Sequence, residues 1–89
     1  MKVLWADDAL LDIERHTGYI AQFNPAAAAM VARHLLDAGN SLAVFPHRGR
    51  RGSEPGTREF LAVHPYVLIY ETSPEAVVIL RIWHGVQQR

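Results

Sequence analysis

The chain has 89 residues, 49% of them hydrophobic, and its nine basic residues balance nine acidic ones. This length suits one small domain, and the hydrophobic fraction is too high for a disordered chain. The absence of cysteine excludes disulfide bonds and thiolate metal sites. The start, MKVLWADDALLDIERH, carries acidic residues where a signal peptide needs an apolar core, and no apolar run reaches membrane-spanning length. We therefore expect a soluble, cytoplasmic protein that forms a single domain over residues 1–89.

Charge is unevenly distributed along the chain. Three basic and five acidic residues precede Pro46, whereas six basic and four acidic residues follow from that point. The second half is thus the better candidate for a contact with an anionic partner. A dedicated nucleic-acid-binding protein is usually far more basic overall, which argues against a large phosphate-contacting surface.

The first third of the chain predicts a strand followed by a helix. KVLW, residues 2–5, is a short apolar strand candidate, and Asp7 or Asp8 would cap the helix that follows. Side chains suited to a buried helix face recur at three- and four-residue steps at Leu10, Ile13, Thr17 and Ile20.

A second helix is predicted over NPAAAAMVARHLLDAGN, residues 24–40. Asn24 can cap it, and Pro25 suits the first helical position because the missing N–H costs nothing there. Gly39 lies where this helix would end or bend, unless the helix continues by a turn to Leu42. The link around Phe23 is very short, so the two helices are expected to form a hairpin.

The rest of the chain predicts a loop and three strands. Glycine and proline mark residues 46–56 as a loop, and the runs TREFLAV, YVLIYET and AVVILRIWH are rich in β-branched and aromatic residues. Short turns separate the three runs, which indicates a three-stranded antiparallel meander. We place the last run in the middle of the sheet, buried on both faces, because it is almost continuously apolar. The fold class is therefore α+β: a short N-terminal strand, a helical hairpin and the meander, with the helices packed on one sheet face.

Four segments, taken in order, carry a resemblance to a known family. They are WADDALLDIERHTGYIAQFNPAAA, FPHRGRRG, GTREFLAVHPYVLIYE and VVILRIWHGVQQR. Together they resemble the RelE/ParE toxins of bacterial type II toxin–antitoxin modules. The GTRE…HPYVLIY pattern and the alanine-rich second helix are closer to the ParE branch.

The resemblance implies a toxin that arrests growth and is neutralised by a ParD- or RelB-like antitoxin encoded nearby, in a hetero-oligomer. ParE-type toxins are linked with DNA gyrase, which is our favoured target, whereas RelE-type toxins cut mRNA on the ribosome. Three hypotheses therefore stay open. The chain is a gyrase-directed toxin, a ribosome-dependent mRNA endonuclease, or a non-toxic remnant that only binds the antitoxin.

Two arginines match positions at which the ribonuclease branch of the resembled family carries an arginine. Arg58 opens the strand after the basic loop, where nucleases of this family place an arginine on the scissile phosphate; a planar, permanently charged fork suits that role. The alternative is an ion pair with Glu59 or Glu71. Arg81 interrupts an apolar strand and needs either a carboxylate partner, such as Glu71, or an opening in the surface.

His84, at the end of the same strand, could move a proton in ribonuclease chemistry or simply bond the backbone. Arg81 and His84 are three residues apart, so in a regular strand they face opposite sides of the sheet. Their joint action would need a bulge, a twist or a strand end between them. Arg58, Arg81 and His84 are thus catalytic candidates only under the nuclease hypothesis.

The basic segment RGRRGSEPGTREF supplies the binding candidates. Arg48, Arg50, Arg51 and Arg58 would hold phosphates or an acidic antitoxin segment; the alternative is a solvated loop. Arginine stays protonated, so none of these can act as a general base. Glu54 is the one loop carboxylate available for that role.

The remaining histidines show no metal-ligand spacing, and no phosphate-binding glycine loop or nucleophile elbow is present. These histidines are His16, His34, His47 and His64. We expect neither a metal nor a cofactor.

Overall fold

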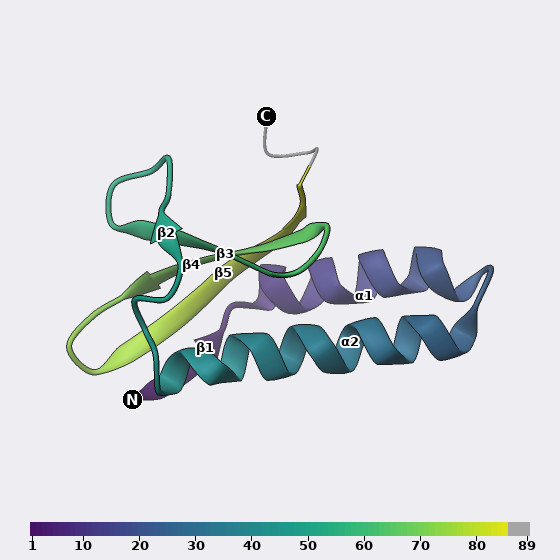
Figure 1. Ribbon diagram of the computed structural model, residues 1–89, viewed down its shortest axis with the longest axis horizontal. Coiled ribbons are helices and arrows are strands. Elements are labelled where there is room, and N and C mark those ends of the chain that lie inside the picture. The colour runs from purple at the N-terminus through teal and green to yellow at the C-terminus, as the bar shows by residue number, and fades with distance from the viewer. Residues whose placement is uncertain (86–89) are drawn as a thin grey trace.

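The computed structural model describes residues 1–85, which form two helices and a mixed five-stranded sheet (Figure 1). In chain order the elements are β1 (Lys2–Trp5), α1 (Asp7–Ala21), α2 (Pro25–Asn40), the 3-10 helix η1 (Ser41–Ala43), β2 (Arg50–Arg51), β3 (Thr57–Val63), β4 (Tyr66–Thr72) and β5 (Ala76–His84). The sheet order is β1-β5-β4-β3-β2, in which β1 runs parallel to β5 and the other pairs are antiparallel. Within this part of the chain, no helix is long and apolar enough to cross a membrane.

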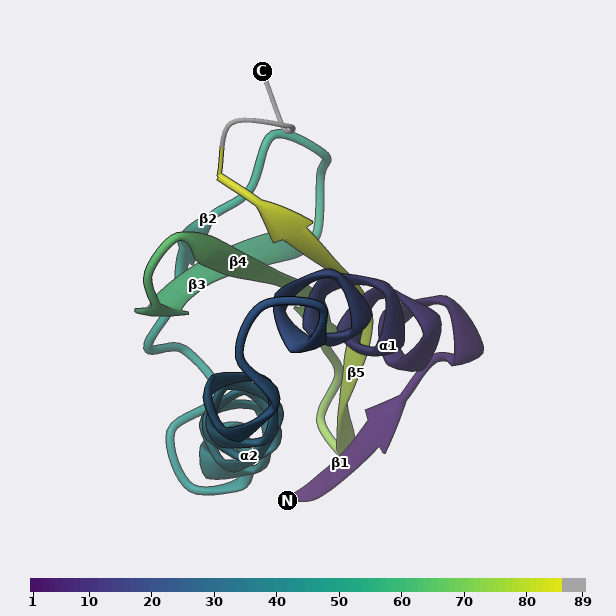
Figure 2. The same cartoon turned by 90° about the vertical axis from the view of Figure 1, so that its right-hand side faces the viewer.

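The predicted α+β fold is confirmed, with two additions. The helical hairpin covers one side of a strongly twisted sheet, as the view along the helices shows (Figure 2). Strand β2, within the segment expected to be a loop, adds an edge strand, and β1 closes the opposite edge by joining β5. The parallel pairing of β1 with β5 could not be read from the meander alone, because it joins the two ends of the described chain.

Helix α2 begins as its sequence indicates. The Asn24 side chain accepts a hydrogen bond from the Ala27 N–H at 3.0 Å, and Pro25 occupies the first helical position. The helix ends at Asn40 and continues as the 3-10 turn η1. Both the cap and the extra turn agree with the prediction for this segment.

Helix α1 begins differently from the prediction. Ala6 occupies the capping position and offers no side-chain hydrogen bond, so the expected aspartate cap is wrong. Asp7 and Asp8 lie instead within the first turn, where negative charge interacts favourably with the exposed N–H groups. The buried face is also rotated from the predicted one: Leu10 is 44% exposed, whereas Ala9 and Asp12 are buried.

The hydrophobic core lies between the hairpin and the sheet. Strand β4 is its central strand, since every residue from Tyr66 to Tyr70 is buried. Placing β5 in the middle of the sheet, buried on both faces, is therefore wrong in detail. That strand has neighbours on both sides, but its burial is uneven, with Val77, Ile79 and Ile82 buried and the residues between them only partly covered.

Two close contacts fix the N-terminal end. The N-terminal ammonium of Met1 donates to the Ala43 carbonyl at 3.2 Å. Gly39, near the end of α2, is buried against the Trp5 ring, and a Cβ at this glycine would overlap that ring and approach Ile79 Cδ1 to 2.6 Å. The glycine is thus required by the packing of α2 on β1 rather than by a helix end.

Candidate functional site

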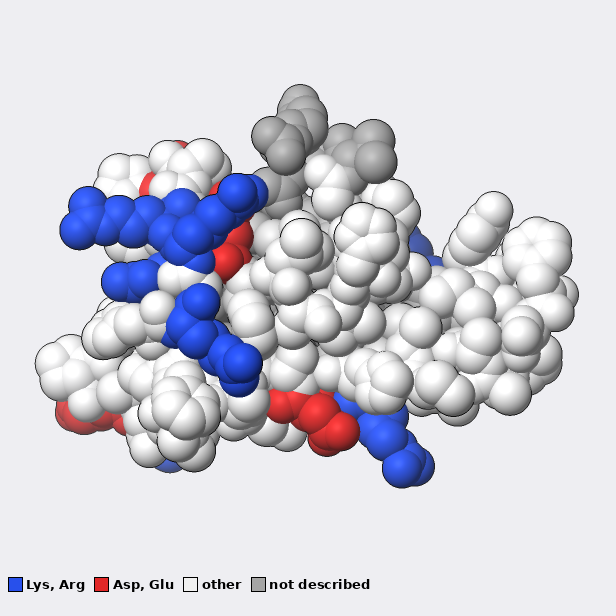
Figure 3. Space-filling view, in the orientation of Figure 1, with Lys and Arg blue, Asp and Glu red and all other residues white. Residues whose placement is uncertain are grey.

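Arginine side chains gather at the end of the molecule that carries β2 (Figure 3). We call Arg48, Arg50, Arg51 and Arg58 the arginine cluster. Arg50 and Arg51 form β2, and Arg51 lies directly opposite Arg58 of β3. Like charges in opposed positions repel each other, so each guanidinium needs its own partner or free access to water.

A buried tyrosine holds the loop that carries the cluster. The Tyr70 hydroxyl donates to the Pro46 carbonyl at 2.8 Å and accepts from the Gly49 N–H at 3.0 Å. Arg58 secures the same loop, since its guanidinium donates to the Gly49 carbonyl at 2.8 Å and to the His47 carbonyl at 3.5 Å. The backbone around the cluster is therefore held in place from both β3 and β4.

The other three arginines of the cluster differ in their partners. Arg48 lies over the Phe60 ring, with its guanidinium carbon 4.6 Å from the ring centre, and donates to the Ser41 hydroxyl. Arg50 donates twice to the Glu59 carboxylate, at 2.9 and 3.1 Å. Arg51 is exposed and makes no ion pair within residues 1–85. Glu59, one of the two carboxylates expected as a partner of Arg58, is thus bound by Arg50 instead.

A groove of about 1010 Å³ runs beside the cluster, along β3 and past the end of β5. We call this cavity the β3 groove. Phe60, Leu61, Pro65 and Val67 make its lining largely apolar, and Leu61 is 58% exposed. The polar groups that line it are Arg48, the ion pair of Arg50 with Glu59, and the histidines His64 and His84.

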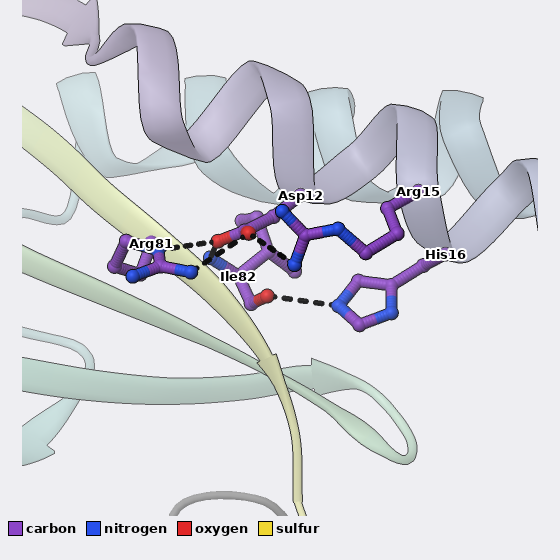
Figure 4. Close-up of polar contacts among 5 residues, drawn as sticks. All are labelled: Asp12, Arg15, His16, Arg81 and Ile82. Atoms are coloured by element: carbon purple, nitrogen blue, oxygen red, sulfur yellow. Dashed lines mark hydrogen bonds and ion pairs between the residues drawn. The ribbon is translucent and has the colours of Figure 1, made fainter.

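A second polar site joins α1 to β5, and we call it the Asp12 clamp (Figure 4). The Asp12 carboxylate is 1% exposed and accepts from Arg81 at 2.7 and 3.0 Å and from the Ile82 N–H at 2.9 Å. Arg15 Nη1 lies 3.5 Å from Asp12 Oδ1, and Nε2 of the His16 ring forms a hydrogen bond with the Ile82 carbonyl oxygen. These groups line a separate cavity of about 170 Å³.

The environment of the clamp favours the charged forms of both Asp12 and Arg81. Burial raises the pKa of Asp12, but the hydrogen bond from Arg81, the Ile82 N–H and the positive charges of Arg81 and Arg15 outweigh it, so that this pKa lies below its usual value. The hydrogen bond to Asp12 raises the pKa of Arg81. Arg81 does have a carboxylate partner, as one of the two hypotheses required, but it is Asp12 and not Glu71.

The three nuclease candidates do not converge on one cavity. Arg81 lines the clamp cavity, His84 lines the β3 groove beside Tyr66, and Arg58 holds the loop backbone. The β4–β5 register does shift, but between the Ile79 and Arg81 pairings, so the strand from Arg81 to His84 is regular. The side chains of Arg81 and His84 therefore lie on opposite faces of the sheet. Their roles in a target site remain predictions.

Three residues that shape these sites gave little signal in the sequence. Asp12 is an acidic residue in an amphipathic helix, and its partners lie 69 and 70 residues away. The sequence around Tyr70 indicates only an aromatic residue of the core, yet its hydroxyl holds the loop that carries the arginine cluster. Glu59 lies in the same groove as His84, whereas the sequence indicates Glu54 as the carboxylate available for the role of a base. Within residues 1–85, no group of three or more potential ligands could hold a metal ion.

A protein-family model decides the family. The model described as the ParE toxin of the type II toxin–antitoxin system parDE matches residues 3–89. The chain belongs to the ParE toxin family. It is thus a type II toxin–antitoxin toxin of the RelE/ParE group, and the arginine cluster, the β3 groove and the Asp12 clamp are features of a ParE-family toxin.

Curated relatives of this ParE-family toxin span nearly its whole length. "Toxin RelE2" of Caulobacter vibrioides is 40% identical, with 97% of each chain covered. "Putative toxin Y4kP" of Sinorhizobium fredii is 36% identical, covering 98% of this chain and 91% of the relative. A relative with a RelE name therefore accompanies a family model with a ParE name, so the names do not separate a ParE-type from a RelE-type target.

Solved structures share the fold of the toxin. The chromosomal ParDE system of P. aeruginosa matches with a TM-score of 0.85 at 19% identity, covering 94% of this chain and 95% of the other. The RelBE2 toxin–antitoxin complex of Mycobacterium tuberculosis matches with a TM-score of 0.64 at 24% identity, covering 93% and 95%. At such low identity these matches establish the fold and nothing finer.

Proposed function

We propose that this ParE-family toxin arrests growth by binding an essential protein target, with DNA gyrase favoured. The observation that carries the proposal is the Asp12 clamp. It occupies Arg81, the strand arginine that a nuclease would need, and holds it in a different cavity from His84. Arg81 and His84, the cation and the proton-transferring group that β5 would supply to a nuclease, are then not brought together, whereas a protein-binding toxin needs neither. The zero net charge and the family model add support.

Supercoiling and cleavage-complex assays with purified gyrase test this function. We expect the toxin to inhibit supercoiling or to accumulate cleaved DNA. We expect Arg51→Glu to weaken the effect, because the exposed Arg51 side chain has neither an ion pair nor a hydrogen bond to another described residue. Arg33→Glu, an equal charge change on α2, is the control. An absence of any effect at high toxin concentration would remove gyrase as the target.

A cognate ParD- or RelB-like antitoxin is part of the proposal. The structural relatives were solved as the ParDE system and the RelBE2 complex, and we extend that partnership to this chain. Exposed apolar side chains on the hairpin support it, since Leu11, Met30 and Leu36 are each between 39% and 58% exposed. An amphipathic antitoxin helix would bind between hairpin and sheet, and an acidic tail would reach the arginine cluster.

The second candidate is a ribosome-dependent mRNA endonuclease. The β3 groove favours it, because Glu59, His84 and Arg48 lie around one cavity. Toeprinting of translating ribosomes would then show codon-specific cuts that disappear in Arg58→Ala and in His84→Asn. An intact message with wild-type toxin would dispose of this candidate.

The third candidate is a remnant that binds the antitoxin without being toxic. Overexpression without growth arrest, together with tight binding to the product of the neighbouring gene, would favour it. Growth arrest on induction of the toxin alone would exclude it.

A further inference from the structure

The end of the hairpin at which the two helices are linked carries no charge. Residues 16–32 contain no Asp, Glu, Lys or Arg, although 20% of the residues of the whole chain are charged. Figure 3 accordingly shows no acidic or basic side chain on the visible face of that end. Membrane headgroups and nucleic-acid phosphates bind mainly through basic side chains, so neither suits this surface.

Two aromatic side chains are exposed at the same end. Tyr19 is 65% exposed and Phe23 is 74% exposed, and their rings contact each other edge to face with centroids 5.5 Å apart. Neither ring belongs to the buried core. Apolar surface left in water costs about 25 cal/mol per Å², so two large rings exposed side by side indicate an interaction surface.

Helix α2 adds small side chains to this surface. Ala26 and Ala29 are exposed on its first two turns, and their spacing of three residues places them on the same face of the helix. Only residues 22–24 separate α1 from α2, so the alanines and the aromatic pair lie at one end of the hairpin (Figure 1). We call Tyr19, Phe23, Ala26 and Ala29 the hairpin tip.

The hairpin tip is suited to contact with a second copy of itself. In a two-fold contact both copies present the same surface, so a charged patch would face its own charge. The tip avoids this repulsion because residues 16–32 are uncharged, and no ion has to be buried. Bulky rings beside small alanines are also complementary in size, since the rings of one copy can occupy the space above the alanines of the other.

From these features we infer that the free toxin forms a two-fold dimer through the hairpin tip, in which Tyr19 and Phe23 of one copy pack on Ala26 and Ala29 of the other. An aromatic side chain buries about 150–250 Å², so the exposed parts of the two rings remove roughly 200–350 Å² per copy from water. A standard interface buries about 800 Å² per partner, and the dimer is therefore weak and reversible. Both arginine clusters stay exposed in it, because the end that carries β2 is opposite the hairpin tip (Figure 1).

The test measures self-association of the full-length toxin, without antitoxin, by sedimentation equilibrium from about 5 to 500 µM, a range suited to a small interface. Phe23→Asp removes a ring, and Ala29→Glu covers the alanine surface. Val44→Asp is the control for the first variant, since Val44 is 71% exposed and lies after η1. Ala62→Glu, at an exposed alanine of β3, is the control for the second. Circular dichroism and melting temperature establish that all four variants fold.

We expect the wild type to change from monomer to dimer over this range. Each tip variant should weaken the association at least tenfold, and each control variant should change it by less than twofold. Added sodium chloride should not weaken it, because the contact contains no ion pair.

A wild-type toxin that stays monomeric at the highest concentration would overturn the inference, and so would wild-type association in both tip variants. Dimers that dissociate as salt is added would indicate a contact through charged residues and would also overturn it. If the wild type were monomeric and Phe23→Asp abolished binding to the antitoxin encoded by the adjacent gene, the hairpin tip would belong to the antitoxin interface instead.

Discussion

Single residues in this toxin are constrained by packing contacts that their amino-acid type alone does not indicate. Gly39 illustrates this, because its place near the end of α2 suggests a helix terminator, yet the helix continues past it to Asn40. The absence of a side chain is needed by the Trp5 ring, which occupies the space where a Cβ would be. Trp5 is fixed in turn by a hydrogen bond from its indole N–H to the Asn40 side chain at 3.2 Å.

We expect Gly39→Ala to lower the free energy of unfolding by about 1–3 kcal/mol, because the added methyl group must displace the Trp5 ring or shift α2. Gly18→Ala is the control within the other helix, where nothing lies within 4 Å of the added methyl group. That substitution should raise stability by about 0.5–1 kcal/mol through helix propensity. Urea denaturation of the two variants measures both changes, and a gain in stability for Gly39→Ala would contradict the packing argument.

Asp12 shows how far one residue's partners can be from it in the sequence. Since its pKa lies below the usual value of about 3.9, its ionised form stabilises the fold at pH values above that, and this stabilisation is lost as the pH falls through the lowered pKa. Asn in its place would keep a hydrogen-bond acceptor but lose the ion pair with Arg81.

We expect Asp12→Asn to be about 1–3 kcal/mol less stable than wild type at pH 7, a range that allows for the partial exposure of Arg81. The difference should narrow as the pH falls below about 4, because Asp12 then takes up a proton in the unfolded chain while the lowered pKa keeps the native carboxylate ionised. Denaturant unfolding at several pH values provides the measurement, with Asp37→Asn, an exposed position on α2, as the control. A difference that stayed constant down to pH 3 would mean that the charge of Asp12 is not what stabilises the clamp.

At the scale of elements, β4 organises the binding end of the toxin through one hydroxyl. Tyr70 lies fully buried in the central strand, and its OH is the link between the core and the loop that bears the arginine cluster. Removing that OH leaves the buried Gly49 N–H without its acceptor, which costs about 1–3 kcal/mol.

Tyr70→Phe should therefore lower stability by that amount and speed amide hydrogen exchange at Gly49 and its neighbours more than in the helices. Antitoxin affinity should fall as well, because Arg48 would no longer be held in advance. Tyr19→Phe is the control, since Tyr19 is 65% exposed on α1. Unchanged exchange at Gly49 in Tyr70→Phe would show that Arg58 holds the loop by itself.

Local signals in the sequence predicted most of the elements. The Asn24–Pro25 helix start and the β-branched runs of β3, β4 and β5 are short-range patterns, and the structure confirms them. The aspartate cap and the buried face of α1 are local failures, and the other failures concern contacts that join distant segments. The β1–β5 pairing, the Asp12 clamp and the Tyr70 contacts each link residues at least 21 positions apart, and no local pattern reports such distances.

The contrast between local sequence signals and long-range contacts also applies to the candidate site. Arginine type and spacing identified the cluster, because guanidinium chemistry is a property of single residues. Which guanidinium is bound internally depends on the fold: Arg81 is held by Asp12, Arg50 by Glu59 and Arg58 by loop carbonyls, whereas Arg51 has no ion pair within residues 1–85. Sequence alone could not rank these arginines by availability.

On the scale of the whole molecule, the arginine cluster and an exposed aromatic pair lie in different regions. The arginine cluster occupies the end that carries β2 (Figure 3). Tyr19 and Phe23, at 65% and 74% exposure, are in contact at the link between the helices. The described chain extends 41 Å along its longest axis. A partner that contacts both regions must be extended, as a segment that folds on binding can be.

The pairing of β1 with β5 has a consequence for biosynthesis. Translation delivers the chain from its N-terminus, yet β1 has its sheet neighbour in β5, and α1 is bound to the same late strand through Asp12. A nascent polypeptide lacking residues 76–84 therefore cannot pair β1 within the sheet or join α1 to β5, although α1 can already pack on α2. The sheet and the Asp12 clamp are completed only after β5 has been synthesised.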